Sequence, residues 1–182
     1  MRIVAGKYKS RRFDVPKSFK SRPTTDFAKE NIFNVIANLI SLEDAEALDL
    51  FSGTGSIAFE LLSRGCKGVT IVEKEAMHYA FIKKVKAELK ADNLTTLRGD
   101  AFKFIEQTSQ SFDFIFADPP YALKNLAQVP ELILSKGILK PEGVFVMEHP
   151  KEYDFSTLPY FSQRRVYGSV NFSVFVPTGL SN

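Results

Sequence analysis

Acidic residues recur in this sequence where short apolar runs end. The runs are 45–51, 68–73, 94–97 and 112–117, and the acids in or directly after them are Asp49, Glu73, Asp100 and Asp118. Runs this short, separated by stretches with helical spacing, predict the strands of a parallel sheet. Such sheets bind ligands along the edge formed by the carboxyl ends of their strands. We therefore expect these carboxylates to gather in one ligand site.

The first run leads into a glycine-rich turn, Ser52-Gly53-Thr54-Gly55, and then into residues 56–64 at helical spacing. A strand, a glycine turn and a helix make the layout of a cofactor-binding unit. Glycine lets the backbone turn tightly and approach a ligand, and the helix N-terminus presents free N–H groups to it. The same spacing also occurs in ordinary tight turns, so the position between strand and helix is what favours a cofactor site.

Asp49 favours one cofactor over another. A dinucleotide would place its pyrophosphate over the glycine turn, where a nearby carboxylate repels it. S-adenosylmethionine has no phosphate and has an ammonium group at its methionine end, so Asp49 predicts this cofactor. Glu73 lies 18 residues after Gly55, about where an acid binds ribose hydroxyls in nucleoside-binding folds. The alternative for Asp49 is a structural role in capping the turn, since a buried unpaired carboxylate is costly.

The fourth run ends in a tetrapeptide, Asp118-Pro119-Pro120-Tyr121, that could act on an amino group. Proline keeps the residue before it extended and offers a carbonyl without an N–H, so the turn is rigid and rich in acceptors. The Asp118 carboxylate and the Pro119 carbonyl could each accept a hydrogen from an exocyclic NH2 and aim its lone pair at a methyl donor. Tyr121 offers a surface on which an extruded base can stack. The alternative is a proline-rich loop that begins a helix.

Composition limits the other classes of function. No apolar run approaches the roughly 20 residues needed to span a membrane, and the first residues lack the apolar region of a signal peptide. The single cysteine, Cys66, allows no internal disulfide, fits a reducing cytoplasm and has no features of a nucleophile. With only two histidines besides, we expect no metal cluster. The length of 182 residues fits one domain.

The positive charge is concentrated at one end. Residues 1–22 contain eight Lys or Arg and one acid, a net charge of +7, whereas the remaining sixteen bases and twenty acids give −4. Such a segment most simply binds a nucleic-acid backbone, and the alternative is a solvated tail. The predicted RNA-binding residues are Arg2, Lys7, Lys9, Arg11, Arg12 and Arg22.

The rest of the chain predicts further elements around the four strands. They are a hairpin over 3–15, a loop over 16–23, a helix from Thr24 or Thr25 to Ile40, a helix over 75–91 with Met77, Phe81, Val85 and Leu89 inward, a helix over 125–135 kinked at Pro130, a strand over 143–148 and a closing hairpin over 164–176. His149 follows the fifth strand, and we expect it to be structural.

Taken together, these motifs resemble the class I S-adenosylmethionine-dependent methyltransferases, in which they occur in the same order. That resemblance implies a Rossmann-like α/β fold with a seven-stranded, mostly parallel sheet whose last strand is antiparallel. The first forty residues resemble more closely the bacterial RsmD family, which methylates N2 of a guanine in 16S ribosomal RNA. The segments that resemble it are 2–9, Arg22-Pro23-Thr24-Thr25-Asp26 and Tyr167-Gly168-Ser169. The chain would then be a core over 45–182 with an amino-terminal extension over 1–44.

The resemblance also implies roles for single residues. Asp49, Gly53 and Gly55 would form the cofactor turn, Glu73 would bind the ribose, and Asp100 the adenine amino group. Ser52, Thr54, Lys74 and Ala101 complete the cofactor set, and Asp118, Pro119 and Tyr121 would handle the guanine. No metal is implied. The expected partner is 16S ribosomal RNA or an assembling small subunit, bound by a cytoplasmic monomer. One departure is Phe27, where the family usually has a basic residue.

Three other functions remain open at this point. An adenine-N6 methyltransferase would use the same tetrapeptide, although the chain has no room for a separate domain that recognises a DNA sequence. A nicotinamide-dependent dehydrogenase is opposed by Asp49 and by the lack of a catalytic Tyr-Lys or His pattern. A non-catalytic RNA-binding module would not need Asp118 and its neighbours.

Overall fold

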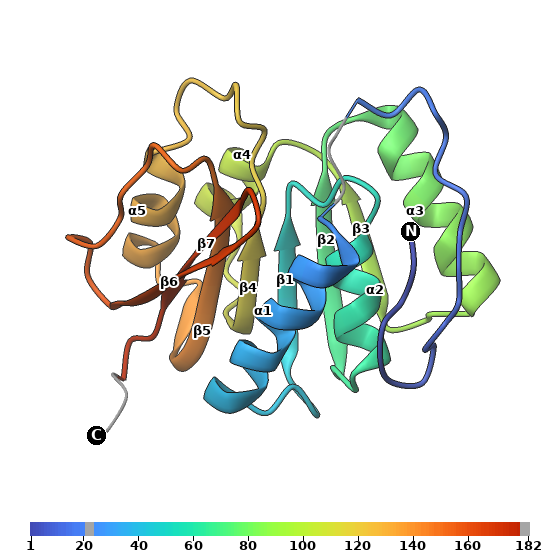
Figure 1. The fold of residues 1–182 in the computed structure, drawn as a ribbon, viewed down its shortest axis with the longest axis horizontal. Coiled ribbons are helices and arrows are strands. Elements are labelled where there is room, and N and C mark those ends of the chain that lie inside the picture. Colours follow the sequence, from blue (N-terminus) through green and yellow to red (C-terminus); the bar gives the residue numbers. More distant parts are fainter. Residues whose placement is uncertain (21–23, 179–182) are drawn as a thin grey trace.

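The computed structural model describes residues 1–20 and 24–178, and its strands form one seven-stranded sheet (Figure 1). The strands are β1 (Glu46–Leu50), β2 (Gly68–Glu73), β3 (Leu94–Arg98), β4 (Phe112–Ala117), β5 (Leu139–His149), β6 (Phe161–Tyr167) and β7 (Val170–Phe175). Their order is β3-β2-β1-β4-β5-β7-β6, and β7 runs antiparallel to both of its neighbours. The predicted Rossmann-like sheet with an antiparallel last strand is confirmed.

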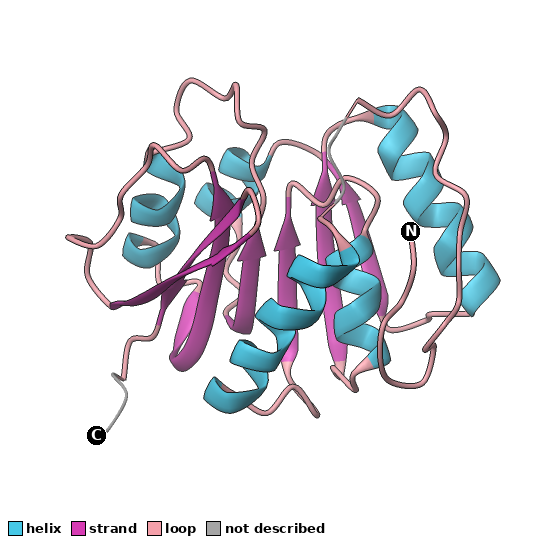
Figure 2. Cartoon of the chain, viewed as in Figure 1, coloured by secondary structure: helices cyan, strands magenta, loops and turns pink. Residues whose placement is uncertain are grey.

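Helices cover both faces of this sheet (Figure 2). The helices are α1 (Asp26–Leu39), α2 (Ser56–Ser63), α3 (Ala76–Leu89), α4 (Ala101–Gln107) and α5 (Gln128–Ser135). One apolar core joins α1, α2 and α3 to the sheet, and a second joins α4 and α5 to the opposite face. Since side chains alternate between the two faces of a strand, the central strands β1, β2, β4 and β5 contribute to both cores. Among the described residues, none of the helices is long and apolar enough to cross a membrane.

The amino-terminal segment packs on the α1–α3 face. Its two arms pair antiparallel through backbone hydrogen bonds between Met1 and Phe13 and between Ile3 and Arg11, but they form no strands, so the predicted hairpin is present only as a short pairing. Ile3 and Phe13 are buried in that core, and the two arms share one antiparallel bridge, between Arg2 and Arg12. The reason lies in the backbone donors of Val4 and Ala5. Both bind the Glu60 carboxylate of α2, at 2.8 and 3.0 Å, and so do not extend a strand ladder.

Three other elements differ from the predictions. The exposed fraction of Met77 is 59%, so it does not point inward, and Ile82 joins the buried stripe of α3 instead. Each step of four residues rotates about 40° beyond a full helical turn. Three such steps separate Met77 from Leu89, so their side chains lie about 120° apart around the helix axis. Helix α4 was not predicted, because it is short. Helix α5 begins only at Gln128, so Pro130 lies in its first turn. A backbone N–H in the first turn has no partner within the helix, so proline fits there without a kink.

Candidate active site

Four acids at or directly after the carboxyl ends of strands lie on one face of the sheet. Asp49, Glu73, Asp118 and Glu148 have the same alternation along their strands as Ala47, Ile71, Phe116 and Val146, which belong to the core under α1, α2 and α3. Side chains two residues apart share a face, so these carboxylates point to the α1–α3 side at the carboxyl ends of β1, β2, β4 and β5. Three of the four predicted carboxylates, Asp49, Glu73 and Asp118, therefore gather on this face, with Glu148 as an additional member, whereas Asp100 follows β3 and caps α4.

Glu73 joins the glycine turn to the end of β2. Its Oε2 accepts the N–H of Gly53 at 2.7 Å, and its Oε1 accepts the N–H of Glu75 at 2.8 Å. The carboxylate is buried, and each of its oxygens has a second lone pair that could accept a further hydrogen. Glu73 can thus hold the glycine turn in place and still bind two hydroxyls of a ligand.

Asp49 is the most deeply buried of these acids, with an exposed fraction of 1%. Its Oδ2 accepts the N–H of Ala58, in the first turn of α2, at 3.2 Å. The structural capping role is therefore real. Burial, aided by the negative charge of Glu73, nevertheless raises the pKa of Asp49 to about 8. The site consequently favours a cationic group that would stabilise the ionised carboxylate.

The glycine turn leaves room for a ligand at one of its glycines. Gly53 has φ +56°, and no atom lies within 4 Å of the place where a Cβ would be. Gly55 has φ +77°, and there a Cβ would come within 2.9 Å of the Phe59 ring. Gly55 is therefore required by close packing against α2, whereas Gly53 lies next to open space. Thr54 between them is buried, and the Ser52 hydroxyl donates to the Asp49 carbonyl at 2.6 Å.

Asp100 and its neighbours complete the predicted cofactor set. One Asp100 oxygen accepts the N–H of Lys103 at 3.2 Å and caps α4, and the other lies 3.7 Å from the Lys74 ammonium. Ala101 is buried behind it. The N–H of Gly99 donates to the carbonyl of Glu73 at 3.0 Å, so the β3 end and the β2 end are held side by side.

The tetrapeptide meets a second carboxylate at the end of β4. The Asp118 N–H donates to the Leu50 carbonyl at 3.3 Å, which holds this residue beside β1. Glu148 of β5 accepts the Tyr121 hydroxyl at 3.2 Å and the Thr24 hydroxyl at 3.0 Å. Burial and the negative charges of Glu148 and Asp49 raise the pKa of Asp118 well above its usual range. Burial also raises the pKa of Glu148, although both hydroxyls oppose this.

The sequence reasoning missed Glu148 and Thr24. Glu148 could have been found by its place at the end of a fifth apolar run, where it repeats the pattern of the other acids. Thr24 had no such signal, because its role depends on how the chain before α1 lies against β5. His149 is structural as expected, since its ring binds the Ser173 hydroxyl and the Pro150 carbonyl, each at 2.8 Å.

The basic segment is folded rather than a loose tail. Lys7 and Arg11 lie over the rings of Tyr8 and Phe13, and Arg2 Nε lies 2.9 Å from Asp26 Oδ2 in an ion pair that lacks hydrogen-bond geometry. Lys9 and Arg12 are exposed. Arg22 lies outside the described residues. Most of these charges are thus available to a phosphate backbone, but on a fixed scaffold.

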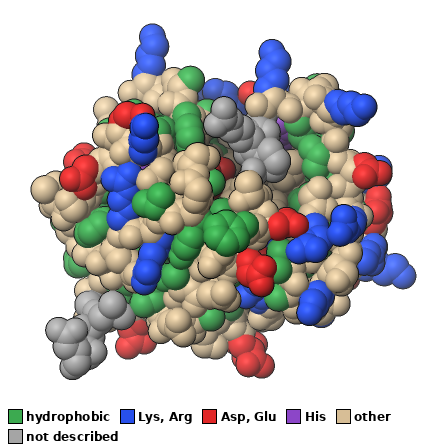
Figure 3. Space-filling model, in the orientation of Figure 1, with side chains coloured by type: hydrophobic (Ala, Val, Ile, Leu, Met, Phe, Trp, Pro, Cys, Tyr) green, Lys and Arg blue, Asp and Glu red, His purple; other side chains and the backbone are tan. Residues whose placement is uncertain are grey.

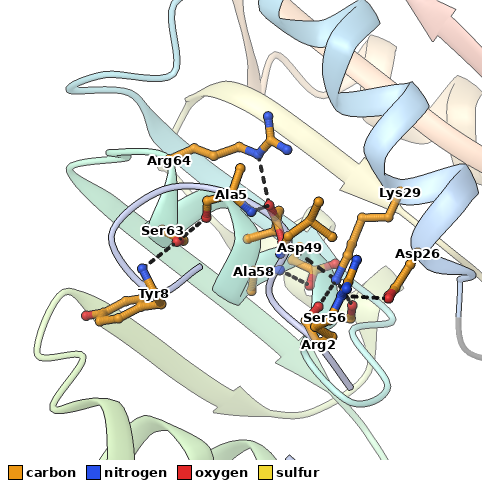
Figure 4. A network of polar contacts seen from close by, with 12 residues as sticks. Arg2, Ala5, Tyr8, Asp26, Lys29, Asp49, Ser56, Ala58, Ser63 and Arg64 are labelled. Carbon is orange, nitrogen blue, oxygen red and sulfur yellow. Dashed lines mark hydrogen bonds and ion pairs between the residues drawn. The ribbon is translucent and has the colours of Figure 1, made fainter. Parts of the chain in front are cut away.

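A buried ion pair fixes this scaffold, and it too was missed from the sequence (Figure 4). The Lys29 ammonium donates to the Arg2 carbonyl, lies 3.0 Å from the Ser56 hydroxyl and lies 3.6 Å from Glu60. Burial lowers the pKa of Lys29, which Glu60 opposes. The signal was a lysine on the apolar face of the helix, one turn from Ile32 and Phe33.

Comparisons with known proteins agree with this geometry. The chain is 34% identical over 160 residues to "Ribosomal RNA small subunit methyltransferase D" of Escherichia coli strain K12, which covers 87% of this chain and 79% of that protein. It is 30% identical to "Putative rRNA methyltransferase YlbH" of Bacillus subtilis, over 98% of this chain and 100% of that protein. The solved structure of "Putative methyltransferase yhhF" from E. coli superposes with a TM-score of 0.85 at 31% identity, and the match covers 97% of both chains.

The sheet, the glycine turn and the acids along its edge, together with these relatives, define a class I methyltransferase. A family model described as "Conserved hypothetical protein 95" matches residues 1–176. The chain belongs to this family, the RsmD family.

Proposed function

We propose that this protein transfers a methyl group from S-adenosylmethionine to the N2 amino group of a guanine in 16S ribosomal RNA. The observation that supports this most is the placement of Asp118 and its prolines beside the Asp49–Glu73 glycine turn, on one face of one sheet edge. The relatives named above as ribosomal RNA methyltransferases support the substrate class. A ribosomal substrate would place the protein in the cytoplasm, where we propose that it acts as a monomer.

The residues of the glycine-turn region fit this cofactor. Asp49 would face the ammonium group, because a cation there would offset the cost of its buried charge. Glu73 would accept the ribose hydroxyls with its free lone pairs, Asp100 would accept from the adenine amino group, and Gly53 has open space above it. When bound, S-adenosylmethionine supplies a methyl group activated by the positive charge on its sulfur.

Asp118 and Pro119 would prepare the acceptor nitrogen. An exocyclic amino nitrogen is a poor nucleophile because its lone pair is delocalised into the ring. Two acceptors fixed by proline geometry would take its hydrogens and orient the lone pair toward the methyl carbon. Methyl transfer would replace the C–S bond of the cofactor by a new N–C bond, so the nitrogen would have to give up one proton. The raised pKa of Asp118 suits its carboxylate to accept this proton.

Tyr121 would hold the base, and Glu148 would position Tyr121. One oxygen of Glu148 accepts the Tyr121 hydroxyl and the other accepts the Thr24 hydroxyl, so Glu148 connects the catalytic turn to the start of α1. The Tyr121 ring is partly exposed and could stack on an extruded base. Glu148 would act as a positioning residue, because its own contacts are to Tyr121 and Thr24.

Single-turnover methyl transfer tests this function. The purified protein, S-adenosylmethionine with a labelled methyl group, and either naked 16S RNA or small-subunit particles that lack the modification should yield labelled N2-methylguanosine. An adenine product such as N6-methyladenosine would overturn the substrate assignment. Transfer to neither RNA nor particle, with tight binding of NAD and none of S-adenosylmethionine, would overturn the methyltransferase function.

A further inference from the structure

An aromatic pair, made of the exposed Phe27 and the partly buried Tyr167, lies near the proposed active site. Phe27, in the first turn of α1, has an exposed fraction of 64%. Its ring meets Tyr167 of β6 edge to face, with centroids 6.2 Å apart and planes at 89°. Single exposed apolar residues are common and need no explanation, whereas a paired exposed aromatic offers a shaped surface.

This pair is anchored to the sheet. Tyr167 lies 6.1 Å from the ring of Phe172 in β7, and Phe172 lies 6.3 Å from Phe116 in β4. Both Phe172 and Phe116 are buried, and Phe116 precedes Asp118 by two residues. A row of aromatic rings therefore runs from solvent to the catalytic strand. Such a surface loses little conformational entropy when a ring stacks on it.

The aromatic pair also lies at the edge of the sheet where the carboxylates gather. Tyr167 pairs with Val170 at the tip of the β6–β7 hairpin, and the adjacent residue Asn171 pairs with His149, directly after Glu148. Phe27 follows Thr24, which binds Glu148, by three residues. The aromatic pair thus lies near the Asp118–Glu148 site, at the same edge of the sheet and on its α1 side.

Basic residues flank the pair. Arg2 neutralises Asp26, the residue directly before Phe27, and Arg12 lies opposite Arg2 in the antiparallel bridge. Arg165 is exposed on the same face of β6 as Tyr167, two residues earlier. Apolar side chains gather near the middle of this face of the molecule, with acidic side chains directly beside them and basic side chains farther out to either side (Figure 3). Aromatic rings between cations suit a nucleic-acid strand, whose bases stack while its phosphates pair.

We propose that Phe27 and Tyr167 form a stacking surface for an unpaired nucleotide that flanks the target base in the RNA. This inference rests on the proposed function and names the part of its substrate that the surface holds. Unpaired RNA bases are characteristically recognised by stacking on aromatic side chains. Phe27 stands where the family usually has a basic residue, and it would thereby contribute to RNA binding through its aromatic ring instead of a charge.

The test compares Phe27→Ala, Phe27→Tyr and Tyr160→Ala with the wild type on naked 16S RNA. Tyr160 is the matched control, since it is a half-exposed aromatic just before β6, at the opposite end of that strand from Tyr167. Phe27→Ala should raise the KM for RNA roughly tenfold or more, as expected for one lost stacking contact, with kcat and cofactor affinity unchanged. Phe27→Tyr should keep the wild-type KM, and so should Tyr160→Ala. Ultraviolet cross-linking of the wild type to RNA should label the peptides that contain Phe27 or Tyr167.

Several outcomes would overturn the stacking surface. If the wild type methylates RNA and Phe27→Ala does so with the same KM, the surface does not bind RNA. If Phe27→Ala affects methylation of ribonucleoprotein particles but not of naked RNA, the pair contacts a protein instead. If the wild type methylates no RNA but cross-links through Phe27, the proposed function fails while the surface stands.

Discussion

Two groups of charged residues lie on the same face of the sheet. The charges of one group are paired with opposite charges, and those of the other are not, as far as the described residues go. Lys29 and Glu60 form a paired group under the amino-terminal segment. The Glu60 carboxylate accepts two backbone N–H groups and contacts both Lys29 and Arg64. Asp49, Asp118 and Glu148 form a group of like charges with no described cation in an ion pair.

The difference separates structural charges from functional ones. Paired buried charges with satisfied hydrogen bonds fix the position of a segment, and removing one partner leaves the other uncompensated. Like charges gathered at a sheet edge raise one another's pKa and favour the uptake of a cation or a proton. The paired group here holds the basic segment in place, and the like-charged group stands where the proposed chemistry occurs.

The largest expected effect comes from breaking the paired group. Lys29→Met should lower the free energy of unfolding by about 3–5 kcal/mol, because buried Glu60 then keeps only Arg64 of its two cations and the Arg2 carbonyl loses its buried donor. Chemical denaturation measures this. Lys84→Met, which removes an exposed helix pair with Glu88, is the matched control and should cost less than about 1 kcal/mol. Equal losses in the two variants would show that the buried pair contributes nothing special.

The second effect tests the like-charged group through Asp118. Asp118→Ala should lower the single-turnover rate by about 10²–10³-fold, as for a lost transition-state contact, and leave cofactor affinity nearly unchanged. Because the proposed step needs the ionised carboxylate and the pKa of Asp118 is raised, the wild-type rate should increase with pH beyond the usual carboxyl range. Wild-type turnover in Asp118→Ala would contradict the mechanism.

The third effect concerns Asp49, which has both a structural role in capping α2 and a proposed role in binding the cofactor. Its pKa rises from 3.8 to about 8, so the folded state binds the proton more tightly than the unfolded state does. Stability is therefore lost as the pH rises between these two values, and Asp49→Asn should be more stable than the wild type above about pH 8. The same variant should weaken S-adenosylmethionine binding by about 1–3 kcal/mol, because it cannot ionise.

Urea unfolding at pH 6 and pH 9, with calorimetry of cofactor binding, checks both parts. Wild-type affinity should increase with pH up to about 8, because binding to the ionised carboxylate releases a proton, whereas the variant should show no such dependence. An unchanged affinity in Asp49→Asn would leave Asp49 with its capping role alone.

The smallest effect concerns the exposed basic side chains. Lys9→Ala and Arg12→Ala should each flatten the salt dependence of RNA binding by about one unit of slope and affect all sequences alike. Filter binding at several salt concentrations measures this, with Lys84→Ala as the control. Deleting residues 1–22 is a poor test, since it strips Glu60 of the Val4 and Ala5 donors and exposes the α1–α3 core. An unchanged slope in both variants would mean that these charges do not contact RNA.

The parallel strands and the acids at their ends could be predicted because both follow from local pattern. Apolar runs identified β1 to β4, and period-two alternation is enough to place Asp49 and Glu73 on one face. What could not be predicted depends on partners distant in sequence. Lys29 forms an ion pair with Glu60, which lies 31 residues later in the chain. Thr24 donates a hydrogen bond to Glu148, which lies 124 residues later. Helix α4 was missed because a seven-residue element has too few turns to show its period.

The bond between Glu60 and the backbone of Val4 and Ala5 also bears on synthesis of the chain. The basic segment is synthesised before α2, so the backbone donors of Val4 and Ala5 cannot bind Glu60 until α2 has been made. The 55 residues that separate Ala5 from Glu60 take about 3–11 s to translate at typical rates, and during this time the segment lacks the carboxylate that docks it. Its docking then begins when Glu60 emerges, so the start of the chain and α2 should become protected from proteolysis together.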